Sequence, residues 1–198
     1  MSEITNGGEI RTACADGILR IDFNRPDKKN AITAAMYQSL ADALVNAGTD
    51  RSVRVILFGS TSAIFTAGND LGDFRSNPPR DGETPVARFL RALSLAEKPL
   101  VAAVGGPAVG IGTTMLLHCD FVIAAHGARF HMPFVDLALV PEAASSYLLP
   151  RLAGWQVEIV ATDLSTEVIE KRAPMLSKAM LATSTSLAIV VAPSLIRR

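Results

Sequence analysis

Two stretches decide the fold of this 198-residue chain: Ile64-Phe65-Thr66-Ala67-Gly68-Asn69-Asp70-Leu71 and Gly105-Gly106-Pro107-Ala108-Val109-Gly110-Ile111-Gly112. Each is rich in small residues, follows an apolar strand-like run and leads into a segment with helical character. Two turns of this kind can point two backbone N–H groups at one position. Donors that are fixed before a reaction stabilise charge as it develops on a carbonyl oxygen, so the pair predicts an oxyanion hole.

Strand-like and helix-like segments alternate on both sides of these turns. Period-two alternation or nearly continuous apolar character predicts strands over 19–23, 53–58, 100–104 and 121–125. Cap residues and apolar faces at helical spacing predict helices that begin after Thr33, after Thr84, near Thr113 and at Pro141, the last ending near Pro150. This order predicts an α/β domain of layered parallel strands with connecting helices, and a site where loops leave the strand ends.

Composition and charge exclude several classes of function. Hydrophobic residues make up 49% of the chain and charged residues 19%, which is typical of a folded domain. Lys+Arg and Asp+Glu total 19 each, so there is no basic field for nucleic acid or anionic lipid. Cys14 and Cys119 lack CxxC spacing, which favours free thiols in a reducing compartment. Residues 1–11 lack a signal-peptide core and no apolar run approaches the ~18 residues of a membrane span, so we expect a cytoplasmic protein without nucleic-acid or membrane partners.

The glycine-rich segment 105–112 has other interpretations. Its spacing is not the GxGxxG of a dinucleotide turn, and the chain contains no GxxxxGK[ST] phosphate loop, so both nucleotide-binding interpretations are weak. The glycines could simply permit close packing or a positive φ, and that alternative stays open. The polar, Pro-rich stretch 75–83 is either a rim over a pocket or an ordinary surface connection.

Glu142 is the candidate acid/base residue. It follows Pro141 at a predicted helix start, where a glutamate is common because its charge suits the positive end of the helix. Its neighbours differ from those of a surface cap, since Leu139 and Val140 precede it and Ala143 follows. A carboxylate in apolar surroundings has a raised pKa and can exchange protons with carbon acids near neutral pH. The structural and the catalytic interpretations both stay open on these residues alone.

Metal and serine-hydrolase chemistry are disfavoured. His118, His126 and His131 show no HxxxH or HExxH spacing and have no cysteine pair nearby, so we expect no metal site. Ser145 and Ser146 lie outside a GxSxG elbow and have no evident histidine partner.

Four motifs follow one another between about Ile18 and Trp155. They are Asn24-Arg25-Pro26-Asp27-Lys28-Lys29-Asn30-Ala31-Ile32, then Phe65-Thr66-Ala67-Gly68-Asn69-Asp70-Leu71, then Lys98-Pro99-Leu100-Val101-Ala102-Ala103-Val104 with its glycine turn through Gly112, and then Cys119-Asp120 with Ala128-Arg129-Phe130. Together they resemble the crotonase superfamily, the enoyl-CoA hydratases and isomerases. The resemblance implies a spiral of ββα units in a core domain of residues 1–155, an acyl-CoA thioester substrate, and a homo-trimer or dimer of trimers.

The C-terminal segment departs from the family pattern. After the position of Trp155 the family continues through a longer helical region that closes the pocket and helps assemble trimers. Here residues 156–198 form a short, divergent segment, for which we expect helices interrupted at Pro174.

The resemblance also implies site residues. One oxyanion donor is the N–H of the residue after the Ala-Gly pair, Asn69, and the other is the N–H of Ile111 in the second glycine turn. The coenzyme A moiety lies along the segment after the first strand and along these turns. The contacts implied are Arg25, Lys29, Ala31, Ala67, Gly68, Asp70, Leu71 and Gly110.

The reaction implied is isomerisation. Hydratases of the family use two glutamates, and the aligned positions here are Thr114 and Phe134, neither of which exchanges a proton as a carboxylate does. Glu142 lies in a Leu-x-Pro-Glu context followed by two serines, which resembles the isomerase branch. The resemblance implies that a 3-enoyl-CoA loses its C2 proton to Glu142 and regains a proton at C4, giving the 2-trans-enoyl-CoA. No metal or redox cofactor is implied, and coenzyme A enters as part of the substrate.

Two alternative functions stay open. One is a catalytically silent acyl-CoA-binding or assembly subunit, because the C-terminal segment is atypical. The other is a different crotonase reaction, such as hydration, thioester hydrolysis or dehalogenation.

Overall fold

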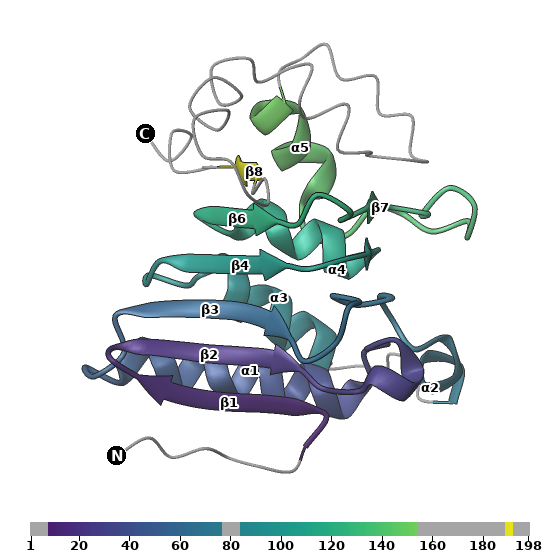
Figure 1. The fold of residues 1–198 in the computed structure, drawn as a ribbon. Coiled ribbons are helices and arrows are strands. Elements are labelled where there is room, and N and C mark those ends of the chain that lie inside the picture. Colours follow the sequence, from purple (N-terminus) through teal and green to yellow (C-terminus); the bar gives the residue numbers. More distant parts are fainter. Residues whose placement is uncertain (1–7, 77–83, 154–188, 192–198) are drawn as a thin grey trace.

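The computed structural model describes residues 8–76, 84–153 and 189–191, and a six-stranded sheet dominates it (Figure 1). The strand order is β1-β2-β3-β4-β6-β8. Strands β2, β3, β4 and β6 run parallel, whereas β1 and β8 pair antiparallel at the two edges. Their bounds are Ile10–Ala15 (β1), Ile18–Phe23 (β2), Val55–Ser60 (β3), Leu100–Val104 (β4), Phe121–Ala124 (β6) and Ile189–Val191 (β8).

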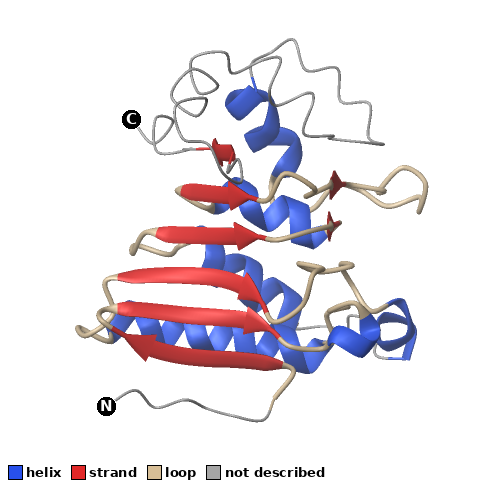
Figure 2. Cartoon of the chain, in the orientation of Figure 1, coloured by secondary structure: helices blue, strands red, loops and turns tan. Residues whose placement is uncertain are grey.

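Helices α1 (Ala34–Thr49) and α3 (Pro85–Ser94) cover one face of this sheet (Figure 2). α1 begins where the sequence predicts, because the Thr33 hydroxyl accepts a hydrogen bond from the Met36 N–H at 3.3 Å. α3 has the same kind of cap, in which Thr84 accepts from the Ala87 N–H at 3.2 Å. The shorter helices are η1 (Pro26–Lys28), α2 (Leu71–Ser76), α4 (Ile111–Thr114), η2 (Met115–His118) and α5 (Ser145–Ala153). The predicted α/β class is confirmed.

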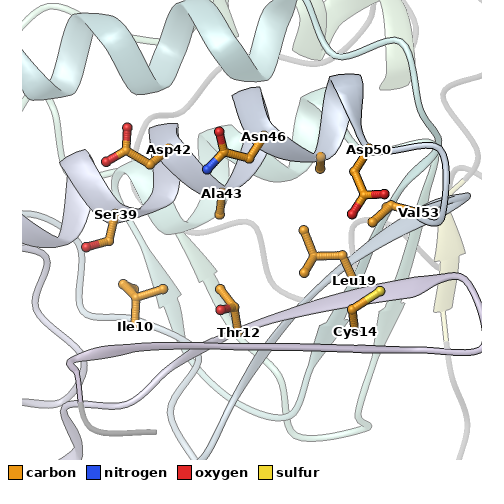
Figure 3. A pocket seen from close by; sticks show the side chains of 11 residues that line it. Ile10, Thr12, Cys14, Leu19, Ser39, Asp42, Ala43, Asn46, Asp50 and Val53 are labelled. Atoms are coloured by element: carbon orange, nitrogen blue, oxygen red, sulfur yellow. The ribbon is translucent and has the colours of Figure 1, made fainter. Parts of the chain in front are cut away.

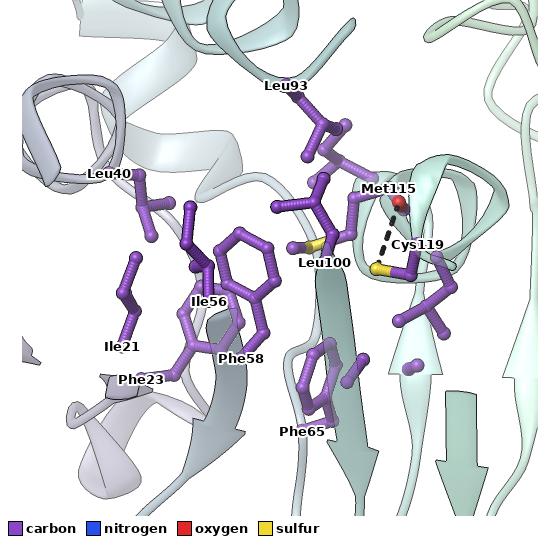
Figure 4. Packing of buried hydrophobic residues seen from close by; sticks show 14 of the residues in the cluster. Ile21, Phe23, Leu40, Ile56, Phe58, Phe65, Leu93, Leu100, Met115 and Cys119 are labelled. Atoms are coloured by element: carbon purple, nitrogen blue, oxygen red, sulfur yellow. Dashed lines mark hydrogen bonds between the residues drawn. The ribbon is translucent and has the colours of Figure 1, made fainter. Parts of the chain in front are cut away.

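An apolar core fills the space between the sheet and these helices (Figure 4). Its most deeply buried members include Ile21, Phe23, Leu40, Ile56, Phe58, Leu93 and Leu100, each no more than 1% exposed. Phe65, from the first small-residue turn, packs edge-on against Phe23 with ring centroids 5.2 Å apart. Burial of one such side chain contributes roughly 1.5–3 kcal/mol. The first turn is therefore anchored in the core.

A second sheet holds the other turn. It pairs β5 (Ala108–Val109) with β7 (Phe130–His131) in parallel. Just beyond β5, the Gly110 N–H donates to the His131 carbonyl at 2.8 Å. The glycine turn after β4 is thereby fixed to a strand that comes later in the chain.

Strand β1 was not predicted from the sequence. β1 and β2 form a hairpin whose turn residues, Asp16 and Gly17, have φ values of 53° and 82°. Asp-Gly is a strong signal for a two-residue hairpin turn, because both positions need a positive φ. The signal was present in the sequence, and β1 could have been found from it.

Helix α5 differs from the prediction at both ends. It begins at Ser145 and not at Pro141, because Ala143 and Ala144 have φ values of 54° and 53°, which a right-handed helix cannot contain. It also continues through Pro150 to its last residue, Ala153. Glu142 therefore lies in a turn before the helix.

Two predicted segments lie wholly or partly outside the residues that the structure describes. These are residues 77–83 of the polar stretch and the helices expected around Pro174. Within the C-terminal segment the described residues form strand β8. Among the residues described, no helix is both long enough and apolar enough to cross a bilayer.

Candidate active site

Both small-residue turns leave the carboxyl ends of parallel strands, the first after β3 and the second after β4 (Figure 1). The first turn lies beside the segment that follows β2. The Ile32 N–H donates to the Gly68 carbonyl at 2.8 Å, and the Asp70 N–H donates to the Ile32 carbonyl at 2.9 Å. The Gly68 carbonyl and the Asp70 N–H both face Ile32. Because successive peptide groups of an extended segment point to opposite sides, the Asn69 N–H between them points away from Ile32.

The two turns are in direct contact, as the sequence predicts. The Val109 N–H donates to the Thr66 carbonyl at 3.0 Å. Gly68 has a φ of +86°, and a β carbon on it would lie 2.8 Å from the Val109 carbonyl oxygen and 3.8 Å from the Gly110 Cα. Gly68 therefore permits the close approach of the two turns. The close-packing interpretation of the 105–112 glycines is correct at Gly106 and Gly112, where an added β carbon would collide with the Ala63 carbonyl oxygen and the Thr66 side chain.

The amides of Asn69 and Ile111 follow these two glycines. Ile111 is the first residue of α4, where an N–H has no partner within the helix. Among the hydrogen bonds of the described residues, neither amide is a donor. Both N–H groups are therefore available to a ligand.

Glu142 is connected to the first turn through Tyr37. Its carboxylate interacts electrostatically with the hydroxyl of Tyr37, and that hydroxyl donates a hydrogen bond to the Asn69 side-chain oxygen. Burial raises the pKa of Glu142 above its ordinary value. Burial, together with the Glu142 charge, also raises the pKa of Tyr37 well above its ordinary value, so that Tyr37 stays a hydroxyl donor.

The backbone around Glu142 is held from two sides. A ring nitrogen of His118, Nε2, is 2.8 Å from the Ala143 carbonyl oxygen, and the Ser145 N–H donates to the Glu142 carbonyl at 3.0 Å. The left-handed conformations of Ala143 and Ala144 are costly for residues with a β carbon. His118 was expected to be structural, and this contact ties the end of η2 to the Glu142 turn.

The residues implied as coenzyme A contacts gather around the first turn. Arg25 forms ion pairs with Asp70 at 2.7 Å and with Glu9 at 2.6 Å, and it donates to the Ala31 carbonyl at 2.9 Å. The hydrogen bond from Arg25 lowers the pKa of Asp70. The Ala67 N–H donates to the carbonyl of the exposed Lys29 at 3.0 Å.

Two further members complete this group. Leu71 opens α2 and is 63% exposed, and Gly110 lies against Gly68. The structure thus brings the eight residues together, and their contact with coenzyme A stays a prediction.

Sequence reasoning did not identify Asn30 or Tyr37. Asn30 is fully buried, and its side-chain nitrogen donates to the carbonyl oxygens of Ile64 and Phe65 at 2.8 and 3.1 Å. Its side-chain oxygen accepts from the Arg25 N–H at 2.7 Å. An asparagine between a lysine and an alanine in a loop gives a weak turn signal, whereas nothing in the helical pattern distinguishes Tyr37 from a core aromatic.

Neither a metal site nor a second hydratase carboxylate is found within the described residues. These residues contain no group of three or more His, Cys, Asp or Glu side chains that could hold a metal ion. Thr114 and Phe134 are buried, and Thr114 donates to the Ile111 carbonyl at 3.5 Å. A pocket of about 480 Å³ lies between the β1–β2 hairpin and α1, lined by Thr12, Cys14 and Asp42 among others, and it includes none of the candidate site residues (Figure 3).

Comparison with known proteins decides the family. The family model described as Enoyl-CoA hydratase/isomerase matches residues 13–168. The chain belongs to this family. Among curated relatives, "Enoyl-CoA delta isomerase 3, peroxisomal" of Mus musculus is 41% identical over 152 residues, covering 74% of this chain and 48% of the relative. "Enoyl-CoA delta isomerase 2" of Rattus norvegicus is 44% identical over 144 residues, covering 70% and 37%.

Solved structures agree with this assignment. The enoyl-CoA hydratase/isomerase from Pseudoalteromonas atlantica T6c superimposes with a TM-score of 0.72 at 46% identity, covering 74% of this chain and 59% of that one. The resemblance to the crotonase superfamily is thereby confirmed, and so is the crotonase-like fold. The matched region of this enoyl-CoA hydratase/isomerase family member spans only 48% and 37% of the length of the two curated relatives.

Proposed function

We propose that this family member is an enoyl-CoA isomerase that converts a 3-enoyl-CoA into the conjugated 2-trans-enoyl-CoA. One observation carries the proposal: a partly buried carboxylate, Glu142, lies within electrostatic range of Tyr37, whose hydroxyl donates to the side chain of Asn69 in the turn after β3. The names of the mouse and rat relatives, both enoyl-CoA delta isomerases, support the same reaction.

The reaction divides between backbone donors and one base. The N–H groups of Asn69 and Ile111 bind the thioester oxygen and stabilise the negative charge on it. Glu142 removes a C2 proton, the double bond moves from C3–C4 to C2–C3, and the same proton is delivered to C4. The raised pKa of Glu142 suits this shuttle, because a base must also give its proton back. No electrons leave the substrate, so the reaction as written needs no redox cofactor.

The test is turnover of a 3-enoyl-CoA, followed by the ultraviolet absorbance of the conjugated product. Glu142→Gln should lower kcat by roughly 10²–10⁴-fold, the usual contribution of a positioned acid/base group. Glu97→Gln makes the same chemical change at an exposed position and should leave the rate unchanged. An unchanged rate in Glu142→Gln would remove the proposed role.

Parallel measurements with a 2-enoyl-CoA and with a non-reacting acyl-CoA distinguish the alternative functions. Thr114 and Phe134 supply no second carboxylate, so we expect no hydration of a 2-enoyl-CoA. Saturable binding of an acyl-CoA without turnover of either substrate would favour the silent binding subunit. Hydrolysis of the thioester would release a free thiol and point to another reaction of the superfamily.

The assembly and location of the protein are proposed on weaker grounds. The resemblance favours a homo-trimer or dimer of trimers, which light scattering would test. Cys14 and Cys119 are both free thiols, which supports the proposed cytoplasmic location. The mouse relative is named as peroxisomal, so imaging of the tagged protein in its own cells should decide.

A further inference from the structure

Tyr37 is a buried hydroxyl that the proposed reaction does not yet use. It lies on α1 with 2% of its surface exposed, and its ring packs against Phe89 with centroids 5.6 Å apart. Its hydroxyl donates to the Asn69 side-chain oxygen, and it is within electrostatic reach of Glu142. One helical side chain therefore contacts the first turn and lies within electrostatic range of the proposed base.

The Asn69 side chain has two different ends. The oxygen can only accept hydrogen bonds and the NH₂ group can only donate them, so the orientation of the amide decides which kind of group it presents on either side. With its oxygen taken by Tyr37, the amide directs its NH₂ group away from α1. The opposite orientation would leave the Tyr37 hydroxyl proton without this acceptor among apolar neighbours, which is unfavourable for a buried hydroxyl.

The geometry points to Tyr37 as a positioning residue that holds the Asn69 amide with its oxygen toward α1 and its NH₂ group toward the acyl-CoA site on the other side. This role rests on the proposed function. A donor on that side is compatible with a developing enolate, whereas an amide oxygen would repel it. Tyr37 thus acts through Asn69 and does not itself contact the substrate.

Tyr37→Phe is the central test, because it removes the hydroxyl and keeps the ring that packs on Phe89. We expect kcat for a 3-enoyl-CoA to fall by about tenfold while KM changes less than about twofold, since the contact acts on the reacting state more than on substrate binding. Tyr147→Phe is the matched control: its side chain is 57% exposed and its ring contact with Arg151 does not use the hydroxyl. That variant should keep the wild-type kcat.

A double-mutant cycle identifies the route of the effect. Asn69→Ala removes the side chain and keeps the backbone N–H. If Tyr37 acts through Asn69, the double variant should be no slower than Asn69→Ala alone. Independent, multiplying losses in kcat would overturn the proposal, as would a wild-type kcat in Tyr37→Phe while Glu142→Gln is inactive. That last result would leave the proposed isomerase function intact.

NMR of the Asn69 side-chain amide tests the positioning role even if the protein does not isomerise any 3-enoyl-CoA. In the wild-type protein labelled with ¹⁵N at asparagine, the Asn69 NH₂ protons should show at most weak nuclear Overhauser contacts with the Tyr37 ring, because the amide oxygen faces it. In Tyr37→Phe these two resonances should shift or broaden as the amide is released. Strong contacts in the wild type, or unchanged resonances in the variant, would overturn the positioning role whether or not the isomerase function stands.

Discussion

Gly68 lies directly against Val109, and this contact joins the two turns of the candidate active site. A β carbon on Gly68 would be 2.8 Å from the Val109 carbonyl oxygen, closer than side-chain carbons approach backbone atoms in real structures. The φ of Gly68 is +86°, which also disfavours any residue with a side chain. Position 68 therefore determines how closely the amides of Asn69 and Ile111 approach one another.

Gly68→Ala should consequently disturb both stability and turnover. We expect the free energy of unfolding to fall by about 2 kcal/mol, because the substitution combines backbone strain with overpacking, and kcat to fall by at least about 100-fold because the donors are displaced. Gly48→Ala is the matched control. Gly48 lies in α1 with nothing within 4 Å of an added β carbon, so that variant should gain about 0.5–1 kcal/mol. Denaturant unfolding and the isomerase assay measure the two effects, and a Gly68→Ala variant with wild-type stability would contradict the contact.

The pH dependence of turnover should reveal Glu142. The base must be ionised to accept the C2 proton, so kcat/KM should fall as the pH drops through the pKa of Glu142. Burial raises that pKa, so the midpoint of the acid limb should lie above the ordinary glutamate value of 4.5. A midpoint at or below 4.5 would show that another group limits the reaction.

The Glu142 carboxyl should also make the stability of the protein depend on pH. Its folded-state pKa is raised, so it contributes most stability when protonated below pH 4.5, and that contribution is lost as the pH rises through the folded-state pKa. Glu142→Gln removes the cost of ionising a buried group and should raise Tm at pH 7. The Tm difference should shrink toward zero below pH 4.5, and calorimetry at the two pH values checks both parts. A Gln variant with a lower Tm at pH 7 would argue against burial of the charge.

Asn30 should be among the least tolerant polar positions. Its side chain is fully buried and joins the segment after β2 to the start of the first turn through several hydrogen bonds. Asn30→Ala removes the acceptor of the Arg25 N–H and the side-chain donor to the Phe65 carbonyl, and should cost about 3 kcal/mol of unfolding free energy. Asn46→Ala, at an exposed position of α1, should cost less than about 0.5 kcal/mol. Equal losses in the two variants would contradict the structural role of Asn30.

The Arg25–Asp70 pair should give a small coupling energy. Its side chains are 16% and 21% exposed, and we expect about 1 kcal/mol in a double-mutant cycle of Arg25→Gln and Asp70→Asn. The pair lowers the pKa of Asp70 from its ordinary 3.8, so its contribution is present at neutral pH and is lost as the pH falls through that lowered value. Unfolding measured at pH 7 and below pH 3 would test the sign. Additive effects at pH 7 would show that the pair contributes nothing.

Local patterns were sufficient for much of the fold. The strand 100–104 was predicted with its observed bounds, and the caps at Thr33 and Thr84 start helices where expected, because each signal depends only on neighbouring residues. The start of α5 was wrong for the opposite reason. Ala143 and Ala144 are good helix formers, and contacts from elsewhere in the chain, including His118, accompany their left-handed conformation.

The features of the candidate site also fall into those that the sequence predicts and those that depend on tertiary contacts. The sequence by itself determined the two small-residue turns, the single glutamate in an apolar context and the family, since these depend on residue types at fixed spacing. Only the tertiary structure decided that Gly68 touches Val109, that Asn30 joins two loops, and that Tyr37 from α1 reaches Asn69. Those contacts connect residues more than thirty positions apart, and they exist only because the parallel sheet brings the ends of separate strands to one edge.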